Sequence, residues 1–134
     1  KIDPTIINGG GINSINNSAK LGKSDWSILE ADESDGSFIY IPPTYSIITN
    51  IDREHMDFYS SMDELNKYFI KFVNKVPSFG KSFICIDDQN NKNFHRCLLQ
   101  HLQCSHSKIQ LLSHCYLEIV HHKLWLYYLS LHLF

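Results

Sequence analysis

The clearest pattern along the chain is an amphipathic helix that begins after Ser61. Its apolar residues recur at helical spacing and share one face; they are Met62, Leu65, Tyr68, Phe69, Phe72, Val73 and Val76. Ser61 and Glu64 have the spacing of a capping box, and Asp63 adds negative charge to the first turn. Turn residues at 77–80 end the pattern, so we predict a helix between Ser61 and Pro77.

Short runs rich in β-branched residues, each followed by turn residues, predict strands around this helix. The expected strands are 5–8, 27–31, 45–51 and 82–86. The run 45–51 is almost continuously apolar, which is typical of a strand buried on both faces of a parallel sheet. The first strand is expected to stop at the glycines 9–11, a flexible exit. The order strand, helix, strand predicts an α/β layer that binds ligands beyond the carboxyl ends of its strands.

An acidic segment follows the predicted strand 27–31. It contains four carboxylates, Glu30, Asp32, Glu33 and Asp35. Like charges this close repel one another unless a cation or hydrogen-bond donors compensate them. Carboxylate oxygens are the ligands that Mg²⁺ uses beside a phosphate. A magnesium site is therefore one interpretation, and a solvated acidic turn that caps the next helix is the other.

A second candidate site, residues 50–57, follows the predicted strand 45–51. It contains Asn50 and His55, and the other seven histidines lie beyond residue 94. A histidine beside acidic residues is a metal ligand or catalytic group in one interpretation and a surface residue at a helix start in the other. Because parallel strands end at the same edge of a sheet, Glu30 and His55 could meet there.

The segment 21–24 has the ending of a phosphate-binding P-loop, but we reject that interpretation. A P-loop requires a glycine five positions before Gly22, where the chain has Asn17, and an apolar strand that leads into the loop. The glycines 9–11 do not open a helix, as a dinucleotide site would require. We therefore expect no cofactor-binding P-loop in this chain.

The composition changes near residue 94. Residues 1–93 carry a net charge of −4 and hold all six glycines and all four prolines. Residues 94–134 carry +2 and hold eleven leucines, seven of the eight histidines and three of the four cysteines. We therefore predict two segments, 1–93 and 94–134. The net charge of the whole chain is −2 without a run of Lys or Arg, so neither nucleic acid nor an anionic membrane is an expected partner.

The cysteines suggest a cytoplasmic protein. We interpret Cys85, Cys97, Cys104 and Cys115 as reduced thiols, because no signal peptide opens the sequence. The most apolar stretch, 124–134, is too short to span a bilayer. At 134 residues the chain is long enough to bury a single core without disulfides or metals.

Five segments taken together are specific to one protein family. They are DPTIINGG (3–10), LGKSDW (21–26), EADESDGSF (30–38), TNIDREHMDFY (49–59) and PSFGKSFICIDDQNN (77–91). In this order and spacing they resemble the central, ATP-binding domain of the Mur ligase family, and within it the branch that adds L-alanine. The resemblance covers residues 1–93.

The resemblance implies part of a Mur ligase central domain, a mainly parallel sheet flanked by helices. It implies an amide-forming ligase of peptidoglycan precursor synthesis that requires ATP and Mg²⁺ and acts on UDP-N-acetylmuramate and L-alanine. By this resemblance Glu30 and His55 hold magnesium at the reacting groups. It also implies a role in orienting the metal shell or the sugar nucleotide for Asp32, Glu33, Asp35 and Asn50. The family's P-loop is expected before residue 1, so the chain alone is expected to be inactive.

Two interpretations of residues 94–134 stay open. The potential zinc ligands are His95, Cys97, Cys104, His106, His114 and Cys115, but their spacing is not that of a zinc finger. Alternatively, and this we favour, the tail is translated from a shifted reading frame, which explains both its composition and its lack of family motifs. Apolar residues at helical spacing still predict helices within it, at 98–102 and 124–131.

The runner-up function is a non-catalytic α/β module that binds a partner or a nucleotide sugar. A third interpretation is that the chain is one half of a split enzyme, whose P-loop is supplied by another polypeptide.

Resequencing the gene locus and translating all three frames tests the interpretation of the tail. We expect a P-loop upstream of Lys1, and the remaining ligase motifs in another frame after codon 94. Absence of these motifs would point instead to a free-standing module, and the metal and partner-binding alternatives would then come first.

Overall fold

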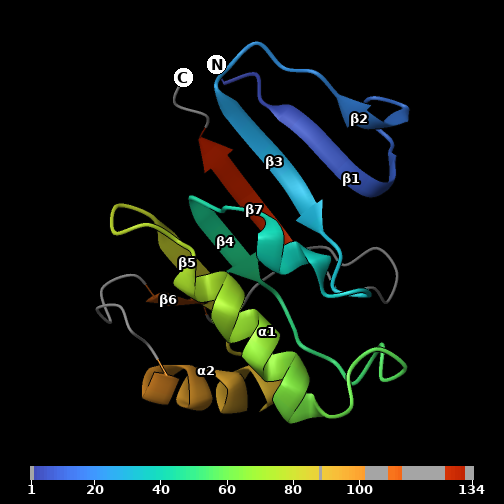
Figure 1. Cartoon of the computed structure of the whole chain (residues 1–134). Coiled ribbons are helices and arrows are strands. Elements are labelled where there is room, and N and C mark those ends of the chain that lie inside the picture. The colour runs from blue at the N-terminus through green and yellow to red at the C-terminus, as the bar shows by residue number, and fades with distance from the viewer. Residues whose placement is uncertain (1, 88, 102–108, 113–125, 132–134) are drawn as a thin grey trace.

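The computed structural model describes residues 2–87, 89–101, 109–112 and 126–131. Along them the elements are β1 (Thr5–Ile12), β2 (Asn17–Lys20), β3 (Trp26–Ala31), the 3-10 helix η1 (Ser37–Tyr40), β4 (Tyr45–Ile48), α1 (Met62–Asn74), β5 (Lys81–Cys85), α2 (Gln89–His101), β6 (Ile109–Leu112) and β7 (Leu126–Leu131). The described strands form one sheet in the order β2-β1-β3-β7-β4-β5-β6 (Figure 1).

Five of the seven described strands run in the same direction, so by strand direction the sheet is mainly parallel, as predicted. β1 pairs in parallel with β3, β4 with β5, and β5 with β6, whereas β2 lies antiparallel beside β1. β7 lies between β3 and β4 and runs antiparallel to both. Ala31 of β3 and Ile48 of β4 both pair with Leu126 of β7, so β3 and β4 run in the same direction and end level with each other. The two candidate segments, which follow these strands, therefore leave the same edge of the sheet.

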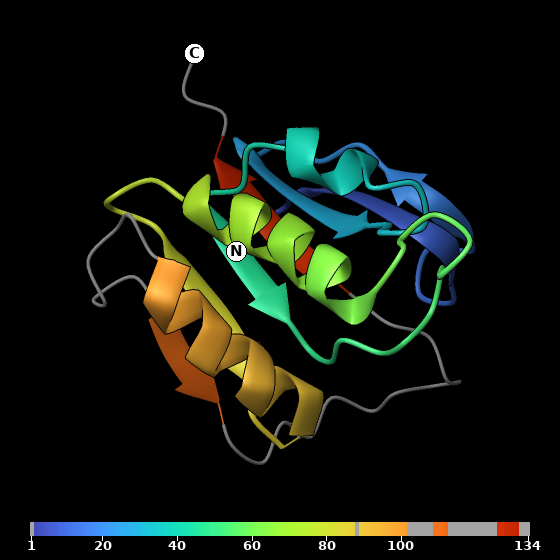
Figure 2. The ribbon, with the colours of Figure 1, turned by 60° about the horizontal axis from the view of Figure 1, so that its bottom comes forward.

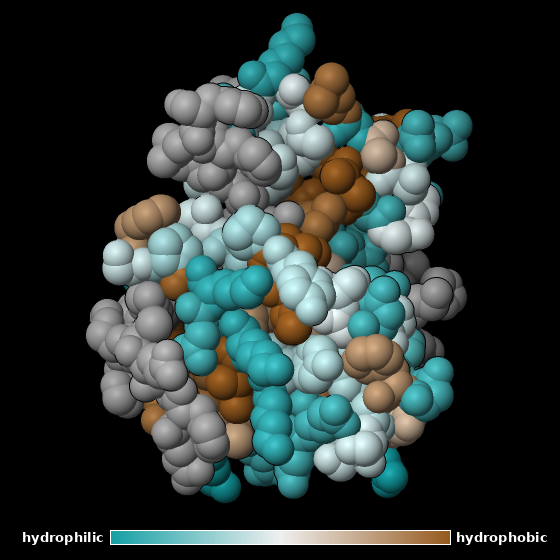
Figure 3. Space-filling model, in the orientation of Figure 1, coloured by the Kyte–Doolittle hydropathy of each residue, from teal (hydrophilic) through white to brown (hydrophobic). Residues whose placement is uncertain are grey.

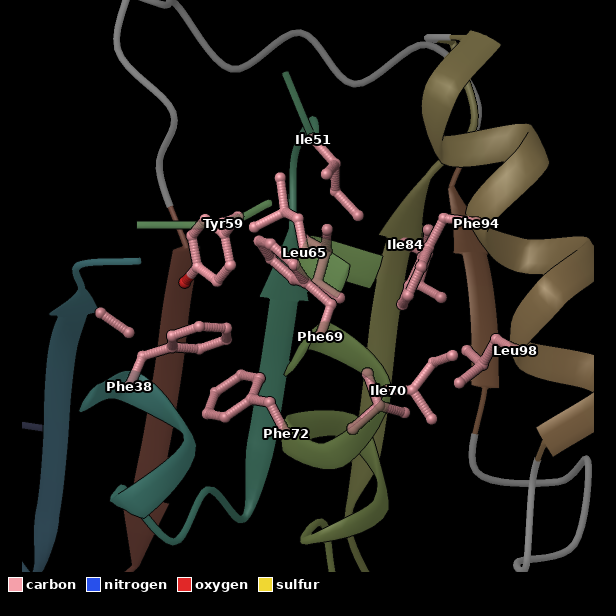
Figure 4. Packing of buried hydrophobic residues seen from close by; sticks show 13 residues of the cluster. Phe38, Ile51, Tyr59, Leu65, Phe69, Ile70, Phe72, Ile84, Phe94 and Leu98 are labelled. Atoms are coloured by element: carbon pink, nitrogen blue, oxygen red, sulfur yellow. The ribbon is translucent and has the colours of Figure 1, made fainter. Parts of the chain in front are cut away.

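The helices cover one face of the sheet and enclose a single hydrophobic core with it (Figures 2 and 4). α1 contributes Phe69 and Phe72, whose rings lie 5.1 and 5.4 Å from the ring of Phe38 in η1. Phe69 also contacts Phe94 of α2, at 6.0 Å between ring centroids. Aromatic side chains in such tilted arrangements bury large apolar areas. The core therefore joins η1, α1 and α2 to the strands beneath them.

Helix α1 begins where the sequence predicts and ends at Asn74, with two residues between it and the turn predicted at 77–80. Ser61 is its N-cap, and the Ser61 hydroxyl accepts a hydrogen bond from the backbone N–H of Glu64 at 3.2 Å. The Glu64 carboxylate reaches back to Ser60 rather than to Ser61, accepting from the backbone N–H and the hydroxyl of Ser60. The bond to Ser61 satisfies the N–H of Glu64, one of the donors that the first turn of a helix leaves without partners. The two bonds from Ser60 lower the pKa of the Glu64 carboxyl.

The predicted end of the first strand at the glycines 9–11 is wrong. β1 runs through them to Ile12 because it pairs with β2, a strand that the sequence analysis missed. The pairing register shifts between Ile7 and Ile12, so the glycines lie in an irregular stretch of the hairpin, where glycine is common. The strands predicted at 27–31 and 82–86 are confirmed as β3 and β5, each within one residue at its ends.

β4 is shorter than predicted and less buried. It ends at Ile48, and its residues alternate between fully buried and half-buried positions rather than being buried on both faces. Ser46 lies on the fully buried face, where its hydroxyl donates to that of Ser82 in β5 at 2.8 Å.

The tail contributes to this sheet and core. α2 crosses residue 94 without a break, and its Phe94 and Leu98 are fully buried. The helix predicted at 98–102 is confirmed as far as His101, whereas the one predicted at 124–131 is wrong for Leu126–Leu131, which form β7. Pairing with β3 and β4 overrides the local spacing there. The potential zinc ligands outside the described residues are Cys104, His106, His114 and Cys115.

The surface agrees with the amphipathic pattern of α1. Figure 3 shows mainly hydrophilic residues over the outward side of this helix and hydrophobic ones beside it. Lys71 extends along the ring of Tyr68, with Nζ 4.9 Å from the ring centroid. None of the helices in the described ranges is long and apolar enough to cross a membrane.

Replacing the N-cap tests the energetic role of α1. We expect Ser61→Ala to lower the free energy of unfolding by about 1 kcal/mol, because the N–H of Glu64 loses its partner. Ser78→Ala, at an exposed serine in the turn after α1, is the matched control and should change it much less. Urea denaturation followed by circular dichroism measures both, and equal effects would contradict the capping role.

Candidate functional site

The candidate site is built from the loops that follow β3 and β4. Glu33 lies in the turn after β3, and Glu54 and His55 lie in the longer loop between β4 and α1. Because these strands end at the same edge, the loops meet above it. The Nε2 atom of His55 lies 3.2 Å from a carboxylate oxygen of Glu33 and 4.0 Å from one of Glu54.

These three side chains form a compact group of potential metal ligands. One ligand atom from each of Glu33, Glu54 and His55 lies within 4.8 Å of the others. The three side chains differ in exposure: that of Glu33 is 7% exposed, against 34% for His55 and 52% for Glu54. A buried carboxylate beside a half-buried imidazole and an exposed carboxylate can bind a cation that arrives from solvent.

Burial dominates the electrostatics of the group. It raises the pKa of the Glu33 carboxyl, because removing the charged form from water costs free energy. A backbone hydrogen bond and the positive charge that His55 carries when protonated act in the opposite direction, while the neighbouring charges of Asp32 and Glu54 raise the pKa further. A positively charged partner, either the protonated imidazole or a metal ion, therefore stabilises the ionised form of the Glu33 carboxylate.

The backbone at His55 has an uncommon conformation. Its φ of 55° lies in the left-handed region, which residues other than glycine seldom adopt. The carbonyl of His55 accepts hydrogen bonds from the backbone N–H groups of Phe58 and Tyr59, at 3.0 and 2.9 Å. This closed turn holds His55 at the sheet edge, and such local strain is often found at functional sites.

The structure places Glu30 apart from this group. Its carboxylate accepts a hydrogen bond from the backbone N–H of Gly9 in β1 at 2.5 Å. A side chain at position 9 would crowd that carboxylate, since a Cβ atom there would lie 3.2 Å from the same oxygen. The structure thus brings His55 together with Glu33 and Glu54, and it holds Glu30 against β1. The role of Glu30 as a metal ligand stays a prediction.

The other predicted site residues make local hydrogen bonds. Asp32 accepts from the backbone N–H of Ser34, and Asp35 from that of Ser37, each at 2.8 Å. The bonds from Ser37 lower the pKa of the exposed Asp35 carboxyl. These are the contacts of an acidic turn, the alternative interpretation of the segment, although Asp35 precedes rather than caps η1.

Asn50 is also held locally. Its amide donates to Asp52 at 2.7 Å, and its carbonyl oxygen accepts from the hydroxyl of Thr49 at 3.1 Å. These bonds order the first turn of the loop that leads from β4 to His55.

Three residues of the site were missed from the sequence. Glu54 could have been found by its position next to His55. Tyr59 ends the same family motif and is fully buried. Asn91 of α2 is fully buried too, and its amide donates to the carbonyls of Thr49 and Cys85, at 2.8 and 2.6 Å, joining the ends of β4 and β5. Nothing in the local sequence indicates these contacts.

Comparison with known proteins identifies the family. The family model of the Mur ligase middle domain matches residues 6–116. The UDP-N-acetylmuramate–L-alanine ligase of Pelagibacter ubique (strain HTCC1062) is 81% identical over 93 residues, which are 69% of this chain and 20% of that protein. The ligases of the same name from Geotalea uraniireducens and Anaeromyxobacter sp. are 49% and 51% identical, over 66% and 64% of this chain.

The extent of these matches has two consequences. The chain spans about a fifth of the length of the relatives that it matches. The family model extends past residue 93 into the segment 94–116, so the boundary predicted from composition lies inside the matched region, and that boundary stays a prediction. The family model covers most of the chain, and the chain therefore belongs to the Mur ligase middle domain family.

Proposed function

We propose that this chain is part of a cytoplasmic ligase that joins L-alanine to UDP-N-acetylmuramate with hydrolysis of ATP. The 81% identity to a relative of that name carries the proposal. Further support comes from the sheet edge, where an imidazole and carboxylates gather at the ends of β3 and β4. Ligands of α/β sheets bind at this edge.

The proposed reaction has two steps. The carboxylate of UDP-N-acetylmuramate is a poor electrophile. One of its oxygens therefore first attacks the γ-phosphorus of ATP, giving an acyl phosphate and ADP. The amine of L-alanine then attacks the acyl carbon, and a tetrahedral intermediate collapses with loss of inorganic phosphate and a proton. Both steps gather negative charge that must be stabilised.

The donors at the sheet edge fit a divalent cation. Carboxylate oxygens suit both Mg²⁺ and Mn²⁺. In the proposed site His55 and Glu30 hold the metal, with Glu33 and Glu54 beside them. When bound, the metal neutralises charge between the reacting carboxylate and the phosphates. Asp32, Asp35 and Asn50, as the family resemblance suggests, order the loops around the sugar nucleotide.

A titration with Mn²⁺ tests the metal site in the chain itself. We expect His55→Ala and Glu30→Gln each to weaken binding by about tenfold or more, because each removes a proposed ligand. Electron paramagnetic resonance of free Mn²⁺ measures the affinity, and Mg²⁺ competition shows whether the two ions share the site.

Two further variants make this titration decisive. Asp63→Asn removes an exposed carboxylate in the first turn of α1 and should leave the affinity unchanged. Glu54→Gln separates the two possible ligand sets. If it weakens binding as much as His55→Ala while Glu30→Gln has no effect, the metal lies on Glu33, Glu54 and His55, and the proposed role of Glu30 is wrong.

An activity assay tests the relation of the chain to the whole enzyme. Because the chain spans about a fifth of its relatives, we expect no release of ADP when the purified chain is mixed with ATP, Mg²⁺, UDP-N-acetylmuramate and L-alanine. The full-length Pelagibacter ubique ligase is the positive control. Release of ADP by the chain that depends on L-alanine would overturn this expectation.

A further inference from the structure

Tyr59 contacts both loops of the candidate site. Its side chain is fully buried, and its hydroxyl donates to the backbone carbonyl of Glu33 at 2.5 Å. Its backbone N–H donates to the carbonyl of His55 at 2.9 Å. One residue therefore holds the backbone of the turn after β3 and the backbone of the loop after β4.

The contact between the loops continues through their side chains. Glu33, whose carbonyl Tyr59 holds, turns its carboxylate to the Nε2 atom of His55 at 3.2 Å. Tyr59, Glu33 and His55 thus form a closed set of contacts: hydroxyl to carbonyl, carboxylate to imidazole, and backbone to backbone. Carboxylates that bond a histidine ring commonly fix its orientation at metal sites.

Packing gives the Tyr59 ring a defined place. Its centroid lies 4.8 Å from that of Phe58 and 5.2 Å from that of Tyr68, both nearly perpendicular to it. Gly36, with φ of 68°, closes the turn after β3 over the same rings, and a Cβ atom there would lie 2.6 Å from Tyr68 and 2.8 Å from Phe58. Packing against the neighbouring rings therefore fixes the Tyr59 ring, while its hydroxyl makes the polar contact with the acidic turn.

We propose that Tyr59 is a positioning residue that holds Glu33 against His55. The Glu33 carbonyl also accepts the backbone N–H of Gly36 at 3.1 Å within its own turn, so the Tyr59 hydroxyl is the donor that joins this carbonyl to the loop of His55. Losing that buried hydrogen bond costs free energy. Removing it frees the turn at Glu33 to move away from the imidazole, although the ring packing stays. The importance of this contact for catalysis rests on the proposed function, but the contact itself requires no metal.

The test removes the hydroxyl alone. Tyr59→Phe keeps the ring and its packing, and Tyr68→Phe makes the same change on a neighbouring ring of the cluster. Both are compared with the unaltered 134-residue chain, free of metal, by nuclear Overhauser contacts between the His55 ring protons and the Glu33 side chain. The His55 signals are assigned by their absence from His55→Gln. Circular dichroism reports whether each variant is folded.

We expect the contact to fall about threefold or more in Tyr59→Phe and to stay unchanged in Tyr68→Phe, since one buried hydrogen bond corresponds to a several-fold change in an equilibrium constant. An unchanged contact in Tyr59→Phe overturns the proposal. Loss in both variants also overturns it, because the cluster as a whole would then be responsible. An unfolded Tyr59→Phe beside a folded Tyr68→Phe would make Tyr59 a structural residue and overturn it too.

The outcome is independent of the proposed metal site. If Mn²⁺ fails to bind while the contact falls in Tyr59→Phe, the proposed metal site is wrong and the positioning role stands. If Mn²⁺ binds through His55 while the contact is insensitive to the hydroxyl, the positioning role is wrong and the proposed metal site stands.

Discussion

The packing of the apolar face of α1 on the sheet is the constraint on which the rest of the structure depends. Phe69 and Phe72 meet Phe38, and Phe69 also meets Phe94, so this face joins η1 and α2 to the strands. Fully burying one such side chain contributes about 1.5–3 kcal/mol. Because Ser61 caps this helix, the loop that carries His55 is fixed at both ends, by β4 before it and by α1 after it.

Buried residues then decide where the loops of the site lie. Asn91 ties the end of β4 to the end of β5, and Tyr59 ties the His55 loop to the turn of Glu33. Loops positioned in this way by a rigid scaffold are common locations for binding and catalysis. Hydrogen bonds from a few buried side chains therefore fix the positions of the loops that carry the exposed groups at the sheet edge.

Much of the fold follows from local patterns, and the failures share one cause. The helix face from Met62, the cap at Ser61 and the strands β3 and β5 depend on residues near one another in sequence. β2, β6 and β7 were missed because each is a strand only through its pairing: polar β2 pairs with β1, β6 pairs with β5, and Leu126–Leu131 has helical spacing but pairs with β3 and β4.

The sequence by itself determined the family, through motifs of high specificity, and the edge of the sheet at which its acidic and histidine segments meet. It did not determine which carboxylate faces His55. Glu30 and Glu33 are equally acidic in sequence, but strand pairing holds one at Gly9, whereas the turn closed by Gly36 and held by Tyr59 directs the other to the imidazole. Only tertiary structure could decide this, because each contact joins residues far apart along the chain, and its strength depends on burial that no local pattern encodes.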